Sequence, residues 1–261
     1  MKDSELIFGL MASFGKEEYS IVDLLHLLQP FNVSETSLRT NLSRMKINGT
    51  LESRKEGKTV FYRFYIRGQK MSRIAELGFS PPSWEGWNNK WFGVIFSINE
   101  ENKENRYKIR KRLQAYRFAP QYPGFWIRPL HPIEREKYKY DEIFNKEYCS
   151  LVELNFTQTL KTGDIQQLWN ISEINREYKI AFNFLKEEQE KFIKLKPEEA
   201  LILKMEIGNK MVNLIIKNPL LPPSYLPENW QGDDLRNEFF KVDKQLTEIS
   251  KTYWNKIFTK T

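Results

Sequence analysis

The sequence predicts an α+β protein in which a helix-and-hairpin domain, a strand-and-helix domain and a mostly helical domain follow one another. Residues 1–79 show three short helical patterns and then a tight hairpin. Residues 90–160 alternate buried strand patterns with helices, and residues 161–261 carry apolar side chains at helical spacing. Residues 80–89, with the sequence SPPSWEGWNN, break all periodicity, so we interpret them as a linker.

The first two helices have recognisable ends. Apolar residues on one face predict a helix over Ser4–Ser13. Ser20 is a suitable N-cap for the second helix, and Asp23 three residues later completes a capping box. Proline cannot continue a helix, so the second helix is expected to end just before Pro30.

The third helix combines a cap, an apolar face and a stop signal. Ser34 is the expected N-cap, and Leu38, Leu42 and Met45 recur at the spacing of one helix face. Gly49 stands where a left-handed C-terminal cap belongs. The third helix is therefore expected to bury one face and to expose the opposite one.

A hairpin follows the third helix. Strands are expected over Leu51–Arg54 and Thr59–Phe64, joined by a tight Glu56-Gly57 turn. Three helices and then a two-stranded hairpin is the order of a winged helix-turn-helix domain, in which the third helix enters the major groove of DNA.

Residue types suited to reading a DNA groove cover the third helix opposite its apolar face. Short hydroxyl and amide side chains fit against base edges and phosphates, and arginine can bridge guanine or reach a phosphate. On a lone helix such a face is most often a solvated surface, but the helix order favours DNA binding here. The predicted DNA-binding residues are Thr36, Ser37, Arg39, Thr40, Asn41, Ser43 and Arg44 on the helix and Arg54, Lys55, Lys58 and Arg63 on the hairpin.

Positive charge is concentrated in the first half of the chain. The formal net charge is +7 at pH 7, from 41 Lys and Arg against 34 Asp and Glu. Residues 39–73 hold ten basic and two acidic side chains, among them Arg67, Lys70 and Arg73. Such a stretch favours phosphate, so double-stranded DNA is the predicted partner.

The central residues predict a ferredoxin-like α+β domain, because strands and helices alternate there over a short distance. Its expected elements are a strand over Trp91–Ile98, a helix over Arg106–Phe118, a strand over Gly124–Arg128, a helix over roughly Ile133–Asn145 and a strand over Leu151–Thr157.

The remainder is predicted to be mostly helical. Helical apolar spacing covers Ile171–Glu190, Pro197–Lys217 and Asp233–Phe258. Asn218–Gly232 contains four prolines and is expected to be a loop. Aromatic side chains at this spacing more often pack in the hydrophobic core than line a ligand-binding site.

Several function classes are disfavoured by composition. No apolar run approaches the ~18–20 residues of a membrane span, and no signal peptide is recognisable, so a cytoplasmic protein without a membrane partner is expected. The single Cys149 excludes a disulfide framework, and two histidines are too few for a His-rich metal centre. No nucleophile-elbow, zincin or dinucleotide-binding motif is present, so we expect no catalytic residue, no metal and no cofactor.

Ordered motifs in all three segments resemble those of one known family. In the first domain they are Leu38–Met45 (LRTNLSRM) with Gly49 and Leu51–Gly57 (LESRKEG). Farther on, Gly124–Pro129 (GFWIRP) looks like that family's GxWIRP strand, and Trp169-Asn170-Ile171 like the start of its W-D-L helix. Asn218–Gly232 is similar to its proline-rich loop, which ends in W-x-G. By these motifs the chain resembles the PaaX-type repressors of phenylacetate degradation.

The resemblance implies a homodimeric transcriptional repressor of a catabolic operon for phenylacetate or another aromatic acid. It implies binding to an inverted-repeat operator and release by an aryl-CoA thioester such as phenylacetyl-CoA. A thioester of this kind needs cationic partners for its phosphates and an apolar site for its acyl group. The candidate effector-binding residues are Arg106, Arg110, Arg117 and Arg128 for the phosphates and Trp126, Trp169, Tyr178 and Trp230 for the acyl group.

Two alternatives belong to other function classes. The central segment also resembles the small CRISPR-associated ferredoxin-like nuclease, whose first strand ends in a metal-binding aspartate. Here the strand Val94-Ile95-Phe96 is followed by Ser97, which cannot supply the carboxylate, so a metal-dependent nuclease is disfavoured. The other alternative is an adaptor whose C-terminal helices bind a protein.

Overall fold

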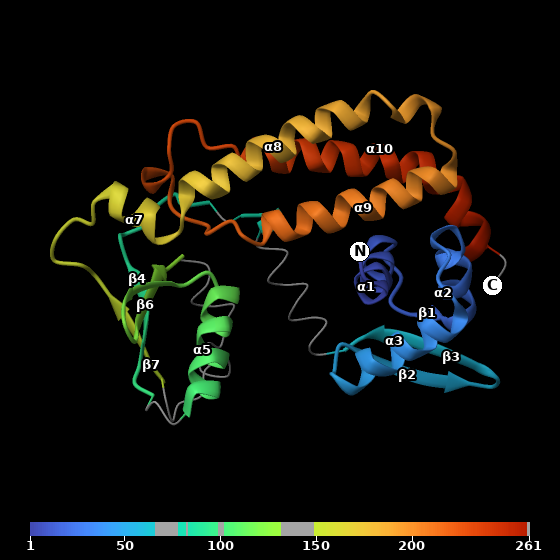
Figure 1. The fold of residues 1–261 in the computed structure, drawn as a ribbon, viewed down its shortest axis with the longest axis horizontal. Coiled ribbons are helices and arrows are strands. Elements are labelled where there is room, and N and C mark those ends of the chain that lie inside the picture. Colours follow the sequence, from blue (N-terminus) through green and yellow to red (C-terminus); the bar gives the residue numbers. More distant parts are fainter. Residues whose placement is uncertain (66–77, 82, 99–101, 132–148, 260–261) are drawn as a thin grey trace. The chain divides into compact units, whose positions relative to one another are not determined.

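The computed structural model describes residues 1–65, 78–81, 83–98, 102–131 and 149–259, and it has an α+β fold (Figure 1). The chain divides into two compact units. Unit 1 comprises Met1–Ala75, Lys179–Ile215 and Asp233–Thr261, and unit 2 comprises Glu76–Tyr178 and Ile216–Gly232. The helix predicted over Ile133–Asn145 and the basic residues Arg67, Lys70 and Arg73 lie outside the described residues.

Unit 1 begins with three helices, which are α1 (Asp3–Ser13), α2 (Ile21–Leu28) and α3 (Glu35–Ile47). The second and third start at the predicted caps, and the first starts at Asp3, one residue before the predicted Ser4. The Ser20 hydroxyl accepts a hydrogen bond from the Asp23 backbone N–H at 3.0 Å, and the Asp23 carboxylate accepts one from the Ser20 N–H at 3.1 Å. The Ser34 hydroxyl likewise accepts from the backbone three residues on, at 3.1 Å.

An antiparallel sheet of three strands completes the N-terminal part of unit 1. Its strands are β1 (Tyr19–Ser20), β2 (Leu51–Glu56) and β3 (Thr59–Phe64), in the order β1-β3-β2. The β2–β3 turn contains Gly57 at φ +58°, a left-handed conformation that glycine adopts without steric cost. The predicted hairpin is confirmed, although its first strand continues past Arg54 to Glu56, which pairs with Thr59 instead of standing in the turn. Strand β1 is too short to leave a pattern in the sequence.

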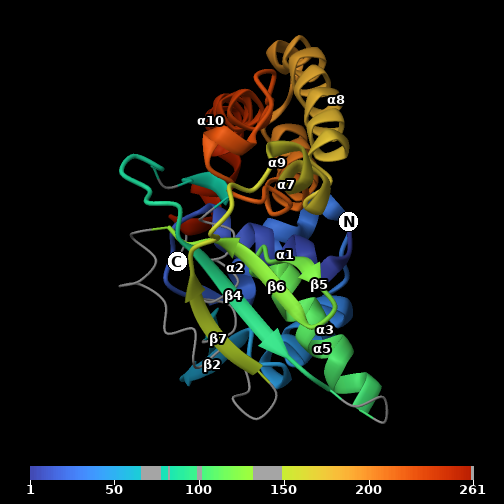
Figure 2. The ribbon, with the colours of Figure 1, turned by 90° about the vertical axis from the view of Figure 1, so that its left-hand side faces the viewer.

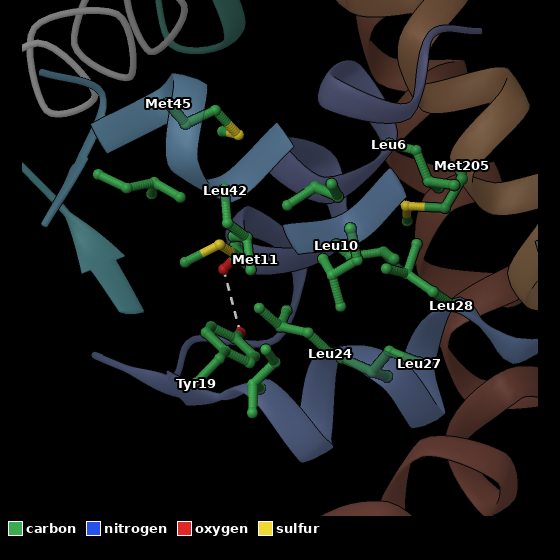
Figure 3. Close-up of a cluster of buried hydrophobic side chains, with 14 of the residues drawn as sticks. Leu6, Leu10, Met11, Tyr19, Leu24, Leu27, Leu28, Leu42, Met45 and Met205 are labelled. Carbon is green, nitrogen blue, oxygen red and sulfur yellow. Dashed lines mark hydrogen bonds between the residues drawn. The ribbon is translucent and has the colours of Figure 1, made fainter. Parts of the chain in front are cut away.

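The core beneath α3 is shared with the C-terminal helices. Leu42 and its apolar neighbours on α1, α2 and α3 are joined in one buried cluster by Leu201 and Met205 of α9 (Pro197–Ile215). Figure 3 shows Met205 beside this cluster, and also the hydrogen bond from the Tyr19 hydroxyl to the Met11 carbonyl, which is 3.0 Å long. Residues about 150 positions apart in sequence therefore stabilise one core.

The end of α10 (Gly232–Phe258) packs on the same part of unit 1. The rings of Phe14 and Trp254 are 5.1 Å apart between centroids. The Tyr253 hydroxyl donates to the backbone carbonyl of His26 at 2.8 Å. Helix α10 thus contacts the end of α1 through an aromatic ring pair and α2 through a hydrogen bond.

Unit 2 is built on a four-stranded antiparallel sheet, shown with its covering helix in Figure 2. The sheet order is β5-β6-β4-β7. Helix α5 (Lys103–Ala115) covers one face and buries Ile109 and Leu113 against it. The strands are β4 (Trp91–Phe96), β5 (Ala119–Tyr122), β6 (Phe125–Pro129) and β7 (Cys149–Leu154).

A second apolar cluster in unit 2 surrounds Trp91 and Trp169. Ile165 of the short helix α7 (Thr162–Leu168) and Tyr225 of the proline-rich loop are buried in this cluster. The long helix α8 (Ile171–Gln189) begins in unit 2 and ends in unit 1.

Some element bounds in unit 2 differ from those predicted. The helix expected to reach Phe118 ends at Ala115, because Arg117 has a left-handed backbone at φ +64° and directs the chain into β5. Strand β5 was not expected, since it contains Pro120, and proline is confined to sheet edges such as this one. The last strand runs over Cys149–Leu154 and so ends before the predicted Thr157.

Candidate nucleic-acid interface

Helix α3 presents an outer face directly opposite its core face. Leu38 and Leu42 are fully buried, whereas Thr36, Thr40 and Ser43 are exposed. At 3.6 residues per turn the exposed residues lie about half a turn around the helix from the buried ones. The spacing of apolar residues that places Leu38 and Leu42 in the core therefore also determines which residues of α3 face outward.

Two predicted residues of α3 are turned away from this outer face. Ser37 donates its hydroxyl proton to the carboxylate of Asp3, and Asn41 donates an amide proton to the Ser37 carbonyl at 2.9 Å. Both side chains are half-buried. The Ser37 hydroxyl joins α3 to α1, and the Asn41 amide is engaged within α3, so both side chains lie beside the outer face rather than on it.

The cations of α3 differ in whether they are already paired. Arg39 donates from Nε to the Glu35 carboxylate at 2.7 Å, and both side chains are exposed. Arg44 and Lys46 are also exposed, and neither forms an ion pair with an acidic residue in the part of the chain that the structure describes. Because an exposed ion pair contributes little free energy, Arg39 can exchange Glu35 for a phosphate at small cost.

Two arginines of the hairpin are paired. Arg54 is hydrogen-bonded to Glu18 and to Glu56, and Arg63 to Glu52. The hydrogen bond from Arg54 lowers the pKa of Glu18 below its usual value. In the unbound protein these contacts neutralise part of the hairpin's positive charge.

The hairpin turn carries two cations. Lys55 and Lys58 flank the turn at Gly57, and both are exposed. Among the described residues neither forms an ion pair. Together with Arg44 and Lys46 they supply four positive charges near α3 and the hairpin turn that are open to an anionic partner.

One residue at the end of α3 was not singled out from the sequence. Ile47 is 84% exposed, although it is a large aliphatic side chain. Its spacing from Thr36, Thr40 and Ser43 is eleven, seven and four residues, which places it on the same stripe of the helix. That spacing is the signal that would have identified it.

Four of the predicted effector-binding residues take part in the packing of unit 2, namely Arg117, Trp169, Tyr178 and Trp230. Trp169 lies in the second apolar cluster and donates from its ring nitrogen to the Arg117 carbonyl at 3.0 Å. Tyr178 is almost fully buried, with its ring 5.2 Å from that of Trp230, and burial raises the pKa of its hydroxyl. Arg117 is also buried and donates from Nε to the Asn218 carbonyl at 2.9 Å.

The other predicted effector residues lie on or beneath α5. Arg110 and Trp126 are brought together as part of the lining of an open hollow of about 480 Å³. Arg106 donates to the Ile98 carbonyl at 2.8 Å, and Arg128 is buried with its guanidinium 5.2 Å from the centre of the Phe118 ring. The remaining lining residues of the hollow are Gln114, Pro120, Gln121, Tyr122, Pro123 and Gly124.

The described part of the chain contains no group of three or more His, Cys, Asp and Glu residues that could hold a metal ion. Ser97 follows β4 and is exposed. Cys149 is buried, and desolvation raises the pKa of its thiol, which disfavours the reactive thiolate. Among the described helices, none is long and apolar enough to cross a membrane.

Three domain models of one family match successive segments of the chain. The "PaaX-like protein" model matches residues 6–67, the "PaaX protein central Cas2-like domain" model matches residues 84–164, and the "PaaX-like protein C-terminal domain" model matches residues 169–256.

Individual relatives agree with these matches. The chain is 22% identical over 241 residues to the transcriptional repressor PaaX of Escherichia coli (strain K12). The alignment covers 88% of this chain and 75% of that protein. Among solved structures, the uncharacterized protein Rv0674 from Mycobacterium tuberculosis superposes with a TM-score of 0.60 at 19% identity, covering 95% of this chain and 96% of that one. At this identity the structural likeness concerns the fold alone.

Proposed function

The chain belongs to the PaaX-like family, since three of its domain models match nearly the whole sequence in order, and from this premise we propose that it is a sequence-specific, DNA-binding transcriptional repressor. Its similarity to a curated transcriptional repressor supports a non-enzymatic regulatory role. The observation that carries the proposal is the exposed outer face of α3, with Arg44 at its side and Lys55 and Lys58 on the adjacent hairpin. Among the described residues none of these three cations forms an ion pair.

The proposed DNA-binding module is a winged helix-turn-helix. Helices α1, α2 and α3 followed by the β2–β3 hairpin support this assignment. In such a module α3 enters the major groove, which is about 12 Å wide, while the hairpin lies along the flanking backbone. For the central segment we propose a ferredoxin-like domain, which the strand order β5-β6-β4-β7 supports.

The first prediction separates base contacts from phosphate contacts. Arg44→Ala is expected to weaken binding to the specific site by ~1–3 kcal/mol, and more than binding to random duplex, because arginine discriminates among bases. Lys58→Ala is expected to weaken both equally and to reduce the salt slope by about one, as loss of a phosphate contact does. Fluorescence anisotropy with a selected site and a scrambled duplex, across a salt series, measures both effects. An equal loss on both duplexes for Arg44→Ala would reassign that residue to the backbone.

We also propose a homodimer on an inverted repeat. Each chain offers one α3, and one helix in one groove segment does not supply nanomolar affinity without a second half-site. Two-fold symmetry of the protein then matches two-fold symmetry of the operator. Sedimentation at micromolar concentration and footprinting on a selected site test this. A monomer that protects a single half-site would contradict it.

The proposed effector is an aryl-CoA thioester such as phenylacetyl-CoA, which would release the repressor from an operon for phenylacetate or another aromatic acid. Family membership supports this effector class. The hollow beside α5 offers both chemistries that a thioester needs, because Trp126 is apolar and α5 carries six basic residues against one acidic residue. Of the predicted effector residues, Arg110 and Trp126 are those that line the hollow.

The second prediction tests this effector at Arg110. Arg110→Ala is expected to weaken phenylacetyl-CoA binding about tenfold, the effect of losing one charge-assisted hydrogen bond, while operator affinity without ligand stays unchanged. Lys103→Ala, an exposed cation at the start of the same helix, serves as the matched control. Calorimetry on the full chain measures both. Absence of heat with every aryl-CoA thioester tested would remove this effector class and leave the DNA-binding proposal standing.

A further inference from the structure

The outermost stripe of α3 carries no charge and several methyl groups. Thr36, Thr40, Ser43 and Ile47 lie within about 60° of one another around the helix axis at 100° per residue. All four side chains are exposed, and Ile47 is 84% exposed. The basic residues of α3, Arg39, Arg44 and Lys46, lie to the two sides of this stripe.

The hydroxyl of Thr40 is engaged within the helix. It donates its only proton to the Thr36 carbonyl at 2.8 Å. Thr40 therefore has no hydrogen-bond donor left for a base edge and can offer a base only its γ-methyl and an acceptor oxygen. The side chain of Ile47, two turns further along the same stripe, has no polar atom. The stripe consequently carries two groups that can contact apolar surface, one on each side of Ser43.

Only one base offers apolar surface in the major groove of unmodified DNA. Thymine carries a 5-methyl group there, and side chains such as alanine and the threonine methyl are its usual protein contacts. A singly exposed isoleucine needs no explanation on most surfaces. The proposed function places this stripe of α3 in the major groove, where Ile47 would be buried against a thymine methyl group. That burial explains why an isoleucine stands at this exposed position.

We propose that Thr40 and Ile47 each contact a thymine 5-methyl group in each half-site of the operator, at different base pairs because seven residues separate them by about 10 Å along the helix axis. This inference rests on the proposed function, since it requires α3 to lie in the major groove. It makes Ile47 a residue that determines DNA-sequence specificity. A search for side chains that can hydrogen-bond to bases does not identify it, because its side chain is apolar. The inference also predicts T·A base pairs in each half-site at which the methyl group itself is selected.

The test removes the methyl group from DNA and from protein separately. A duplex site is first selected from a random library with the full chain, and each thymine of a half-site is then replaced singly by deoxyuridine, which lacks only the 5-methyl. At one position or more, the wild-type protein is expected to bind the deoxyuridine duplex about fourfold more weakly, the effect of about 0.8 kcal/mol for one buried methyl-sized group. Substitution in both half-sites is expected to give about sixteenfold, if the two act independently.

The variant arm uses two exposed isoleucines. In Ile47→Ala the penalty for deoxyuridine should disappear at the position that Ile47 contacts, whereas in Ile193→Ala it should remain, because Ile193 is 94% exposed but lies outside α3. Thr40→Ser, which keeps the hydroxyl and removes the methyl, should reduce the penalty at the position that Thr40 contacts. Both α3 variants change exposed side chains, so circular dichroism is expected to match that of the wild type.

Distinct outcomes overturn the inference and the proposed function. A selected site at which no deoxyuridine replacement weakens binding would overturn the methyl contact and leave DNA recognition intact. A full penalty retained in Ile47→Ala would overturn the role of that residue. If no sequence is enriched from the library, the proposed function itself fails, and this contact with it.

Discussion

Replacing Leu201 by alanine is expected to destabilise the N-terminal part of unit 1 by ~2–5 kcal/mol, although Leu201 is about 150 residues distant from α3 in sequence. Leu201 is fully buried in the cluster that contains Leu38 and Leu42. Truncation removes its buried methyl groups and leaves a cavity that the packed neighbours fill only in part. Equilibrium unfolding in urea, followed by circular dichroism, measures the loss.

The prediction also specifies which helices lose protection from hydrogen exchange. Native-state hydrogen exchange should show faster exchange in α1, α2 and α3 as well as in α9, because one core serves all four helices. Ile193→Ala, which shortens a 94% exposed side chain, should leave both the midpoint and the exchange pattern unchanged. Loss of protection confined to α9 would contradict a shared core.

Gly124→Ala is expected to destabilise unit 2 by ~2–5 kcal/mol. Gly124 has φ +79°, where a side chain costs ~1–2 kcal/mol. An added Cβ would also lie 2.5 Å from the carbonyl oxygen of Phe96, which is backbone and cannot move without disturbing β4. Relief of such crowding typically costs a further ~1–3 kcal/mol. Chemical denaturation of the full chain checks the sum.

A second glycine of unit 2 separates the two causes. Gly86 has φ +73°, but a Cβ placed there would meet no atom within 4 Å. Gly86→Ala should therefore show only the conformational cost of ~1–2 kcal/mol. Equal losses at the two positions would mean that contact with Phe96 contributes nothing.

The local elements of the N-terminal part followed from the sequence because their determinants lie close together in the chain. The capping bonds at Ser20 and Ser34 join groups three residues apart, and the hairpin turn depends on Gly57 alone. Strand β5 did not follow, because Pro120 argues against a strand and only its place at a sheet edge permits one.

The candidate site divides in the same way. The exposed position of Thr36, Thr40 and Ser43 is set by the apolar period of α3, so it could be predicted. The pairing of Arg54 with Glu18 could not, because the two residues are 36 positions apart and meet only through the fold. Likewise, Trp169 and Tyr178 were candidates for a ligand wall, and their burial in unit 2 became visible only with their neighbours in place.

By itself the sequence determined the family, the local elements and the outward face of α3, since ordered motifs and helical periodicity are properties of the chain alone. It did not determine which apolar faces meet. The apolar pattern of an amphipathic helix such as α9 predicts that one face is buried. Because burial of apolar surface is non-directional, the pattern does not indicate which other element that face contacts. Only the tertiary structure decided that Leu201 and Met205 complete the core beneath α3, because close packing selects among apolar faces by shape.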